Sequence, residues 1–329
     1  MGENYGLPYT GSKSRIAHWV IDNLPGGRVL IDAFAGGCSI THRALLSKKW
    51  MTIIANDINF KYPQLFLDAV RGKYRDERRW ISREDFERLK AKDAMVACCF
   101  SFGNNLRSYM YSKAIEPYKR ALHYAIVLDD FAPMQELMPE VSQAVADAIH
   151  WQNSLHDRRI TVQNVIVKTL KRLTGDNCAH QIVQGNPLYK TIRHTSRNTP
   201  SLESLESLER LERLQSLERL ERMQSLESLE RMQVTSLSYD EIDIPPDAVV
   251  YCDPPYHACD KDLYEGTASF DHNAFYDWCV RVSKTNPIFI SEYSIEDDRF
   301  EVVAEKQKMT CLSSVKSFNV TERLYTVKK

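Results

Sequence analysis

The chain has 329 residues, of which 43% are hydrophobic and 26% charged, and its formal net charge is −1. Such a chain can bury a substantial core, which indicates a globular protein with one large domain carrying insertions or two smaller domains. It contains no apolar run of about 18 residues, and its N-terminus lacks the basic-then-apolar order of a signal peptide. We therefore expect no membrane span, no secretion and a cytoplasmic location.

Cysteine spacing and local charge refine this picture. The eight cysteines form no CxxC pair, so we expect reduced, mostly buried thiols and assign no metal. The net charge of the whole chain is near zero, but residues 151–200 form a basic stretch. They contain eight Lys or Arg and two acidic residues. Such a stretch is suited to follow a phosphate backbone.

The first predicted elements form a βαβ unit. The β-branched apolar run at 28–34 predicts a buried strand, since it ends at Gly36-Gly37 and is followed by a helix-compatible segment at 39–47. The run at 51–55 predicts a second strand. Two strands joined by a helix imply a parallel sheet.

From Lys61 to about Ile182 the pattern becomes helical, with Ser82 ahead of an amphipathic segment and a similar pattern at 141–148. We interpret this stretch as an insertion. Strand patterns then resume at 248–252 and 287–291, and end in an expected antiparallel pair near 309–315 and 323–327. The sheet is therefore expected to be assembled from both ends of the chain.

A triplet repeat occupies Ser201 to Gln233, with 11 triplets that each have Leu or Met in the centre. Its period of 3.0 does not keep these residues on one face of an α-helix, whereas a 3₁₀ helix would align them. A helical rod of either type, a solenoid-like stack and disorder all stay open. The segment is either an expandable surface insertion without a chemical role or a surface for self-association or partner contact.

The most informative motif is Asp253-Pro254-Pro255-Tyr256, directly after the apolar run at 248–252. A carboxylate at this place can accept hydrogens from an amino group whose nitrogen is a poor nucleophile, and can stabilise the positive charge that develops there. The prolines stiffen the loop and orient a backbone carbonyl near Pro254. Tyr256 offers an aromatic face on which a base flipped out of a duplex can stack.

Two further motifs precede it. In Asp32-Ala33-Phe34-Ala35-Gly36-Gly37-Cys38 the glycines allow close approach of a cofactor, and Asp57, after the second strand, is placed to bind ribose hydroxyls. The third motif, Pro8 to Lys13, is a polar loop ahead of a helix that starts near Ser14.

These motifs, in this order, resemble the DNA adenine methylase (Dam-like, D12 class) family of N6-adenine methyltransferases. The resemblance covers about half of the chain and also includes 56–59, 290–293 and 322–325. Phe100 to Asn105 looks like a segment of phage-borne members. The family implies a role in DNA modification in a bacterial cell or phage-infected host, as in restriction–modification systems.

The resemblance implies a Rossmann-like α/β methyltransferase sheet with an inserted, mainly helical target-recognition region. It implies catalysis by Asp253 and Tyr256 with their two prolines, and no metal. S-adenosylmethionine is expected to contact Tyr9, Lys13, Asp32, Phe34, Ala35, Gly36, Gly37 and Asp57. The family often has glycine where this chain has Cys38, and the triplet repeat is not part of the family pattern.

The sequence suggests residues that contact double-stranded DNA. Arginine can read guanine edges and lysine can hold phosphates, although each candidate is also explained by an ordinary solvated helix surface. The candidates are Arg107, Tyr109, Lys190, Arg193, His194 and Arg197.

We expect a catalytic domain formed by 1–60 and 234–329, a recognition insertion at 61–200 and the repeat at 201–233. The expected reaction is methyl transfer from S-adenosylmethionine to N6 of adenine in duplex DNA, with base flipping. One alternative is methylation of another nitrogen, such as cytosine N4 or a protein glutamine, although those enzymes usually carry Asn or Ser at position 253. The other is a DNA-binding relative that has lost catalysis.

Overall fold

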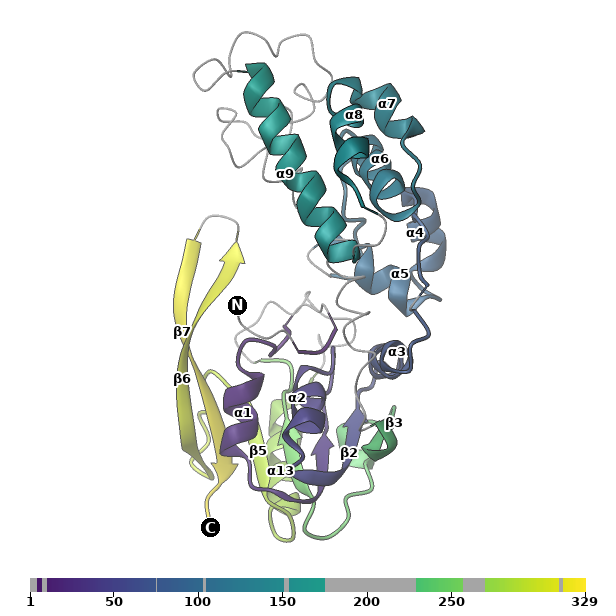
Figure 1. The fold of residues 1–329 in the computed structure, drawn as a ribbon. Helices are drawn as coiled ribbons and strands as arrows, with labels where there is room; N and C mark the ends of the chain where they lie inside the picture. Colours follow the sequence, from purple (N-terminus) through teal and green to yellow (C-terminus); the bar gives the residue numbers. More distant parts are fainter. Residues whose placement is uncertain are drawn as a thin grey trace. The chain divides into compact units, whose positions relative to one another are not determined.

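The computed structural model describes residues 5–7, 11–74, 76–102, 105–150, 154–174, 229–256, 270–313 and 316–329. The chain forms two compact units, which we call the sheet unit (Met1–Lys73 with Met223–Lys329) and the helical unit (Tyr74–Arg222) (Figure 1). The first division between the two units falls after Lys73. No helix among the described residues is long and apolar enough to cross a membrane.

The sheet unit is built on one seven-stranded sheet with the order β3-β2-β1-β4-β5-β7-β6. Strands β3, β2, β1, β4 and β5 are parallel to one another, whereas β7 is antiparallel to both β5 and β6. The strands are β1 (Gly27–Asp32), β2 (Trp50–Asn56), β3 (Met232–Thr235), β4 (Val249–Cys252), β5 (Ile288–Glu292), β6 (Phe300–Ser313) and β7 (Lys316–Val327). This confirms the predicted α/β class and parallel sheet.

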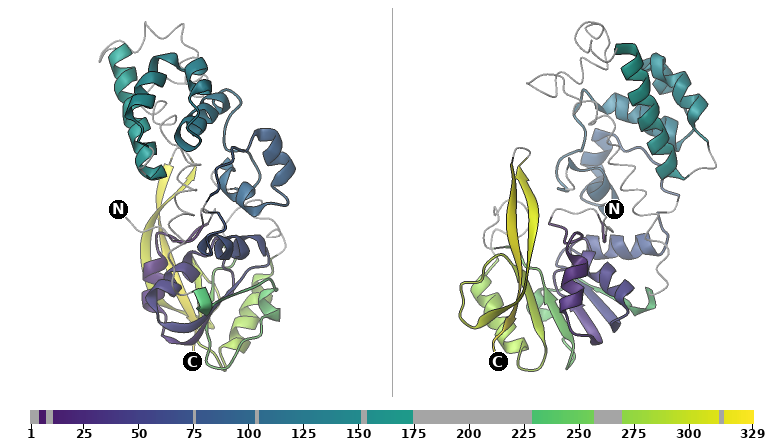
Figure 2. Two further views of the ribbon diagram at one scale, coloured as in Figure 1. Left: turned by 45° about the vertical axis from the view of Figure 1, so that its right-hand side comes forward. Right: turned by 60° about the vertical axis from the view of Figure 1, so that its left-hand side comes forward.

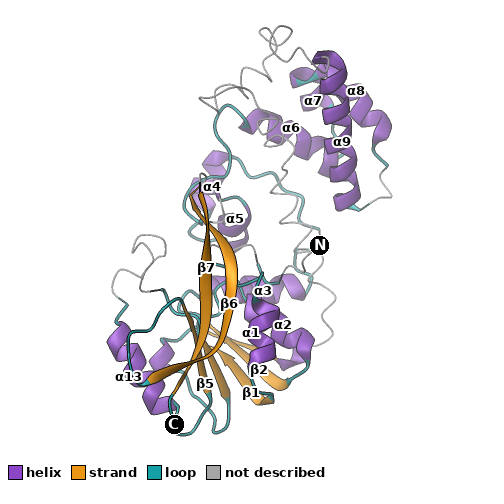
Figure 3. Cartoon of the chain, turned by 90° about the vertical axis from the view of Figure 1, so that its left-hand side faces the viewer, coloured by secondary structure: helices purple, strands orange, loops and turns teal. Residues whose placement is uncertain are grey.

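Helices cover both faces of this sheet, which explains why the interior of its central strands is mostly apolar. All four residues of β4 are buried, as are the last four of β1. Helix α13 (His272–Val282) packs Phe275 and Trp278 against β1, β4 and β5. On the other face lie α1 (Ala17–Asn23) and α2 (Ser39–Ser47), as Figure 3 shows. Helix α3 (Lys61–Val70) also belongs to this unit.

The last two strands form a hairpin that is longer than expected from the sequence. Strand β7 pairs with β5 only at Arg323, Leu324 and Tyr325, whereas it pairs with β6 along most of its length. Figures 1 and 2 show the hairpin extending past the end of β5. The predicted antiparallel pair is therefore correct in type, but both strands begin earlier and Met309 pairs with Asn319.

Strand β3 was not expected, because its residues overlap the end of the triplet repeat. Near the end of the repeat, Leu229–Arg231 forms one turn of 3₁₀ helix, and Met232–Thr235 then pairs in parallel with β2. Arg231 donates from Nη1 to the carbonyl of Trp50 at 2.9 Å and from Nη2 to the carbonyl of Leu45 at 2.6 Å. The end of the repeat is thus part of the sheet unit, and the rest of it lies outside the described residues.

The described part of the helical unit consists mainly of helices. Val141, Val145, Val162 and other apolar residues from α6 to α9 form its core. Ser82 and Asp93 cap α4 and α5 by accepting hydrogen bonds from backbone N–H groups, as helix N-caps commonly do. The helices are α4 (Arg83–Leu89), α5 (Ala94–Cys99), α6 (Glu116–Val127), α7 (Ala132–Leu137), α8 (Pro139–Ala148) and α9 (Leu155–Thr174).

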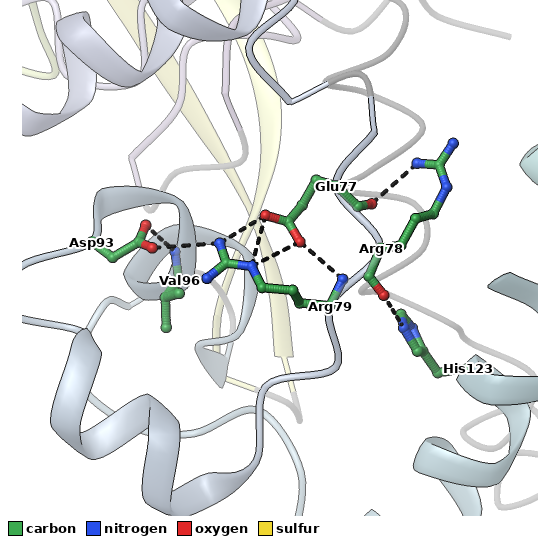
Figure 4. Close-up of polar contacts among 6 residues, drawn as sticks. All are labelled: Glu77, Arg78, Arg79, Asp93, Val96 and His123. Atoms are coloured by element: carbon green, nitrogen blue, oxygen red, sulfur yellow. Dashed lines mark hydrogen bonds and ion pairs between the residues drawn. The ribbon is translucent and has the colours of Figure 1, made fainter. Parts of the chain in front are cut away.

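The segment before α4 is tied to two helices (Figure 4). Arg79 forms a bidentate pair with Glu77 at 3.0 and 2.7 Å, and its Nη2 lies 3.6 Å from Asp93 at the start of α5. His123 of α6 donates from Nε2 to the carbonyl of Arg78 at 2.9 Å. Residues 77–79 therefore connect α5 and α6 through fixed polar contacts.

Arg231 leads to a prediction about the boundary of the repeat. Deleting 201–233 is expected to prevent stable folding because it removes Arg231 and half of β3, whereas deleting 201–228 retains them. Soluble yield and cooperative urea unfolding would distinguish the two deletions. Arg231→Met is expected to lower the free energy of unfolding by about 2 kcal/mol; equal behaviour of the two deletions would contradict this assignment.

Candidate active site

The carboxyl ends of three adjacent strands bring together acidic side chains from distant parts of the sequence. Asp32, the last residue of β1, pairs in register with Ala55 of β2 and Tyr251 of β4. Asp57 and Asp253 follow those two strands and so lie at the same edge as Asp32. In parallel sheets covered by helices, ligands bind at this edge.

Lys13 places a buried ammonium group between two carboxylates. Its Nζ lies 2.8 Å from Oδ1 of Asp253 and 3.8 Å from Oε1 of Glu322. The side chains of Lys13 and Asp253 are only 8% and 18% exposed, so solvent screens the pair weakly. Sequence reasoning assigned Lys13 to the cofactor, whereas the structure places its ammonium on the predicted catalytic carboxylate.

Tyr256 is fixed on three sides. The Lys13 ammonium lies 4.4 Å from the centre of its ring, Tyr293 packs edge-on at 4.6 Å, and its hydroxyl donates to Oε1 of Glu322. Burial and the nearby Asp253 and Glu322 carboxylates raise the pKa of Tyr256 well above its usual value. The hydroxyl therefore stays protonated and acts as a donor.

The loop that carries the two prolines is attached to α13 through Pro255. Pro254 is buried, and the carbonyl of Pro255 lies 2.9 Å from Nε2 of His272 at the start of α13. Because a carbonyl only accepts, Nε2 of His272 carries the hydrogen. This contact fixes the loop between Asp253 and Tyr256.

The glycine turn and Asp57 form a second cluster. Asp57 accepts hydrogen bonds at 2.8 Å from the N–H groups of Gly36 and Asn59. Burial raises its pKa, although these two hydrogen bonds act in the opposite direction. The N–H of Ala35 donates to the carbonyl of Asn56 at 2.8 Å. The ends of β1 and β2 are thereby held together at the predicted cofactor-binding turn.

Asp32 is fully buried, and only one of its oxygens is hydrogen-bonded. Oδ2 accepts from the N–H and hydroxyl of Thr41 at 3.1 and 2.7 Å, whereas Oδ1 has no partner. Burial, followed by repulsion from Asp253 and Asp57, raises the pKa of Asp32 to about 7, although its hydrogen bonds to Thr41 lower it. An unpaired buried carboxylate oxygen is costly, so Oδ1 is suited to receive a donor or a cation from a ligand.

Residues 5–7 form a short N-terminal strap across the glycine turn. The N–H of Leu7 donates to the carbonyl of Gly37 at 2.7 Å. The N–H of Gly6 donates to Nδ1 of His42 at 3.0 Å, and the N–H of Tyr5 donates to Oγ of Ser14 at 2.7 Å. These contacts tie the strap to α2 and to the segment that carries Lys13.

Cys38 departs from the glycine that the family often has, and the structure explains what this requires. Its φ and ψ are 58° and 33°, the left-handed region that favours glycine and costs other residues about 1 kcal/mol. Cys38 therefore adopts the left-handed backbone conformation that a glycine would adopt at this position. All five cysteines whose side chains are described are buried.

Phe34 and Tyr109 have structural contacts of their own. Phe34 is partly buried and packs against Tyr239, Phe270 and Phe275 beside α13. Tyr109 is 7% exposed, and its hydroxyl donates to the carbonyl of Ile81 at 2.8 Å. The ring and the hydroxyl of Tyr109 both make contacts inside the helical unit, and its assignment as a DNA contact stays a prediction.

Arg107 is exposed, and its assignment as a DNA contact likewise stays a prediction. Several other predicted residues lie outside the described part of the chain: Tyr9, Lys190, Arg193, His194 and Arg197.

Glu322 was not predicted as a site residue. The segment that contains it was part of the family resemblance, but no local signal gave it a role. Its position beside Lys13 and Tyr256 depends on the pairing of β7 with β5, which the sequence did not specify.

Gly6 gives a test of the strap. A Cβ at this position would lie 2.3 Å from the carbonyl oxygen of Gly37, and φ is +68°. Gly6→Ala is therefore expected to lower the free energy of unfolding by about 3 kcal/mol, measured by urea denaturation. The matched control is Gly26→Ala, where the nearest atom is 3.4 Å away; equal effects of the two substitutions would argue against the strap.

Part of the chain is similar to known proteins. The type II methyltransferase M2.HphI of Haemophilus parahaemolyticus is 43% identical over 64 residues, which are 19% of this chain and 18% of that relative. The similarity thus spans less than a fifth of the relative's length. Residues 9–124, which include Lys13, the glycine turn and Asp57, match the family described as D12 class N6 adenine-specific DNA methyltransferase, and this confirms the family resemblance expected from the sequence.

Proposed function

We propose that this protein transfers a methyl group from S-adenosylmethionine to N6 of adenine in duplex DNA. The observation that carries the proposal is the position of Asp253. Its carboxylate follows β4, contacts Lys13 at 2.8 Å and adjoins Tyr256, at the sheet edge that also carries Asp32 and Asp57. The family match over residues 9–124 supports the same reaction.

The residues at the ends of β1 and β2 fit the cofactor. S-adenosylmethionine carries a positively charged sulfur and an ammonium group, and it supplies an electrophilic methyl group. The neighbouring carboxylates of Asp32, Asp57 and Asp253 repel one another, so a cationic ligand would lower the electrostatic energy of the site. The unpaired Oδ1 of Asp32 is suited to the ammonium, and Asp57 to the ribose hydroxyls.

The residues around β4 fit the base. A carboxylate oxygen of Asp253 can accept an amino hydrogen of adenine and stabilise the positive charge that develops on the nitrogen. The ring of Tyr256, held in place by Glu322 and Tyr293, offers a face for stacking. Reaching this position requires the base to leave the duplex, and fixing both substrates on one rigid edge contributes much of the acceleration.

Asp253→Ala is the direct test of this proposal. The wild-type protein is expected to move radiolabelled methyl groups from S-adenosylmethionine to unmethylated genomic DNA, with the label recovered as N6-methyladenine after digestion to nucleosides. The variant is expected to lose at least about 10³-fold in rate, because it lacks the acceptor of the amino hydrogen. Exposed Asp243 provides the control variant Asp243→Ala.

Three outcomes would contradict the proposal. Label in cytosine or in protein glutamine would indicate methylation of another nitrogen. Cofactor and DNA binding without transfer would indicate a catalytically inactive relative. Full activity in Asp253→Ala would remove the assigned role of the carboxylate.

The pKa of Asp32 gives a second test. Since this pKa is about 7 without ligand and a bound cation favours the ionised carboxylate, ligand binding below pH 7 must displace a proton. Affinity for S-adenosylmethionine is therefore expected to fall as pH decreases from 7 to 5.5, by up to about tenfold per unit, and to level off above pH 7. Isothermal titration calorimetry in buffers of different ionisation enthalpy measures both the affinity and the released proton.

Asp32→Asn is the matching variant. It should bind the cofactor more weakly at pH 8 and lose most of the pH dependence, with a residual slope from Asp57, whose pKa is also raised. Wild-type affinity that does not change between pH 5.5 and 8 would exclude Asp32 as the group that meets the cation.

A further inference from the structure

Glu322 contacts two residues of the candidate site, Lys13 and Tyr256. It is fully buried, and its neighbours Arg323 and Leu324 pair with β5. Its Oε1 accepts the hydroxyl of Tyr256 and lies 3.8 Å from Nζ of Lys13. A carboxylate in this position acts on both residues.

In the absence of a base, the Lys13 ammonium contacts the carboxylate and the aromatic ring that the base would contact. Its ammonium contacts Oδ1 of Asp253 at 2.8 Å and lies over the ring of Tyr256, 4.4 Å from its centre. A base that stacks on Tyr256 and donates to Asp253 needs the same ring face and the same acceptor. An ammonium left at Asp253 would also oppose the positive charge that develops on the amino nitrogen.

The ammonium cannot leave this region without a counter-ion. Both Lys13 and Asp253 are largely buried, and separating a buried charge from its partner is strongly unfavourable. Glu322 offers a second carboxylate within about 1 Å of contact distance, since a close ion pair lies near 2.8 Å and the present separation is 3.8 Å. A small movement of one side chain would exchange one ion pair for the other.

We propose that Glu322 is a positioning residue that takes the Lys13 ammonium from Asp253 when the target base enters, while it holds Tyr256 through the hydroxyl. This inference rests on the proposed function. The exchange leaves the total charge of Lys13, Asp253 and Glu322 unchanged. It frees the Asp253 oxygen and the Tyr256 ring in the same step.

Glu322→Gln separates the two roles of this side chain. Glutamine keeps an oxygen that accepts the Tyr256 hydroxyl but removes the charge that receives Lys13. The expected result is a fall in the single-turnover rate of about 10²-fold at saturating cofactor and DNA, with dissociation constants for both changed less than threefold. Removing the retained ammonium as well, in Lys13→Met/Glu322→Gln, should make the rate at least tenfold faster than in Glu322→Gln.

Fluorescence of 2-aminopurine at the methylated position reports entry of the base. We expect the wild-type enhancement to be lost in Glu322→Gln and regained in the double variant. The control is Glu305→Gln, which removes a carboxylate from an exposed pair with Arg323 on the same hairpin and should leave rate and fluorescence unchanged. A double variant as slow as Glu322→Gln, or slower, would overturn the inference and indicate a purely structural role.

Urea unfolding separates this inference from the proposed function. If Lys13 and Glu322 form one charge network, the two substitutions should be non-additive, with a higher midpoint for the double variant than for Lys13→Met. Additive midpoints would overturn the inference even in an active enzyme. A wild-type protein that transfers no methyl group would instead refute the proposed function, while the midpoints still show whether the two residues are coupled.

Discussion

The parallel pairing of β4 with β1 is the constraint on which the candidate site depends. The register that places Leu30 opposite Val249 also places Asp253 just beyond the level of Asp32. A shift of one residue would turn the β4 side chains to the opposite face. Because the pairing concentrates carboxylates at one buried edge, it also creates a need for a cation. Lys13 meets that need, so the N-terminal segment is an integral part of the site.

The chain leaves this edge for the helical unit and returns at β3, and Asn56 holds the returning segment. Its side-chain nitrogen donates to the carbonyls of Ala33 and Leu237, both at 3.0 Å. Its side-chain oxygen accepts from the hydroxyl of Thr235 and the N–H of Leu237. One buried amide therefore joins β1, β2 and the segment after β3, next to Asp57. This connection is made entirely inside the sheet unit.

Much of the fold could be predicted because local signals agreed with tertiary structure. The apolar run before Gly36 and the segment from Ser39 to Ser47 matched β1 and α2. Strand β3 was missed because Met232 and Gln233 fit the triplet pattern equally well, and only pairing with β2 decides their conformation. A four-residue strand has too little sequence to show a period of its own.

For the candidate site too, local sequence signals identified some residues, whereas the positions of others depend on tertiary contacts. Asp253 and Asp57 were identifiable because each follows a buried strand directly. Glu322 lies in a strand with charged and polar neighbours, so its sequence resembles a solvent-exposed hairpin, and its burial depends on Lys13 and Tyr256 from elsewhere in the chain. The burial of Tyr109 could not be predicted, because an aromatic residue near exposed Arg107 looks the same in sequence whether it faces solvent or the core.

In the ligand-free site, each of the two proposed substrates must displace a different positive charge. Asp32, with a pKa of about 7, reduces its unfavourable charge by binding a proton, whereas Asp253 is compensated by the Lys13 ammonium. A cationic cofactor would replace the proton, which is a mobile species whose activity pH controls. An incoming base would replace the ammonium, which is covalently attached and must be received by another group within reach. Binding of the cofactor therefore depends on the pH of the solution. Binding of the base depends instead on a group of the protein, Glu322, that can receive the ammonium.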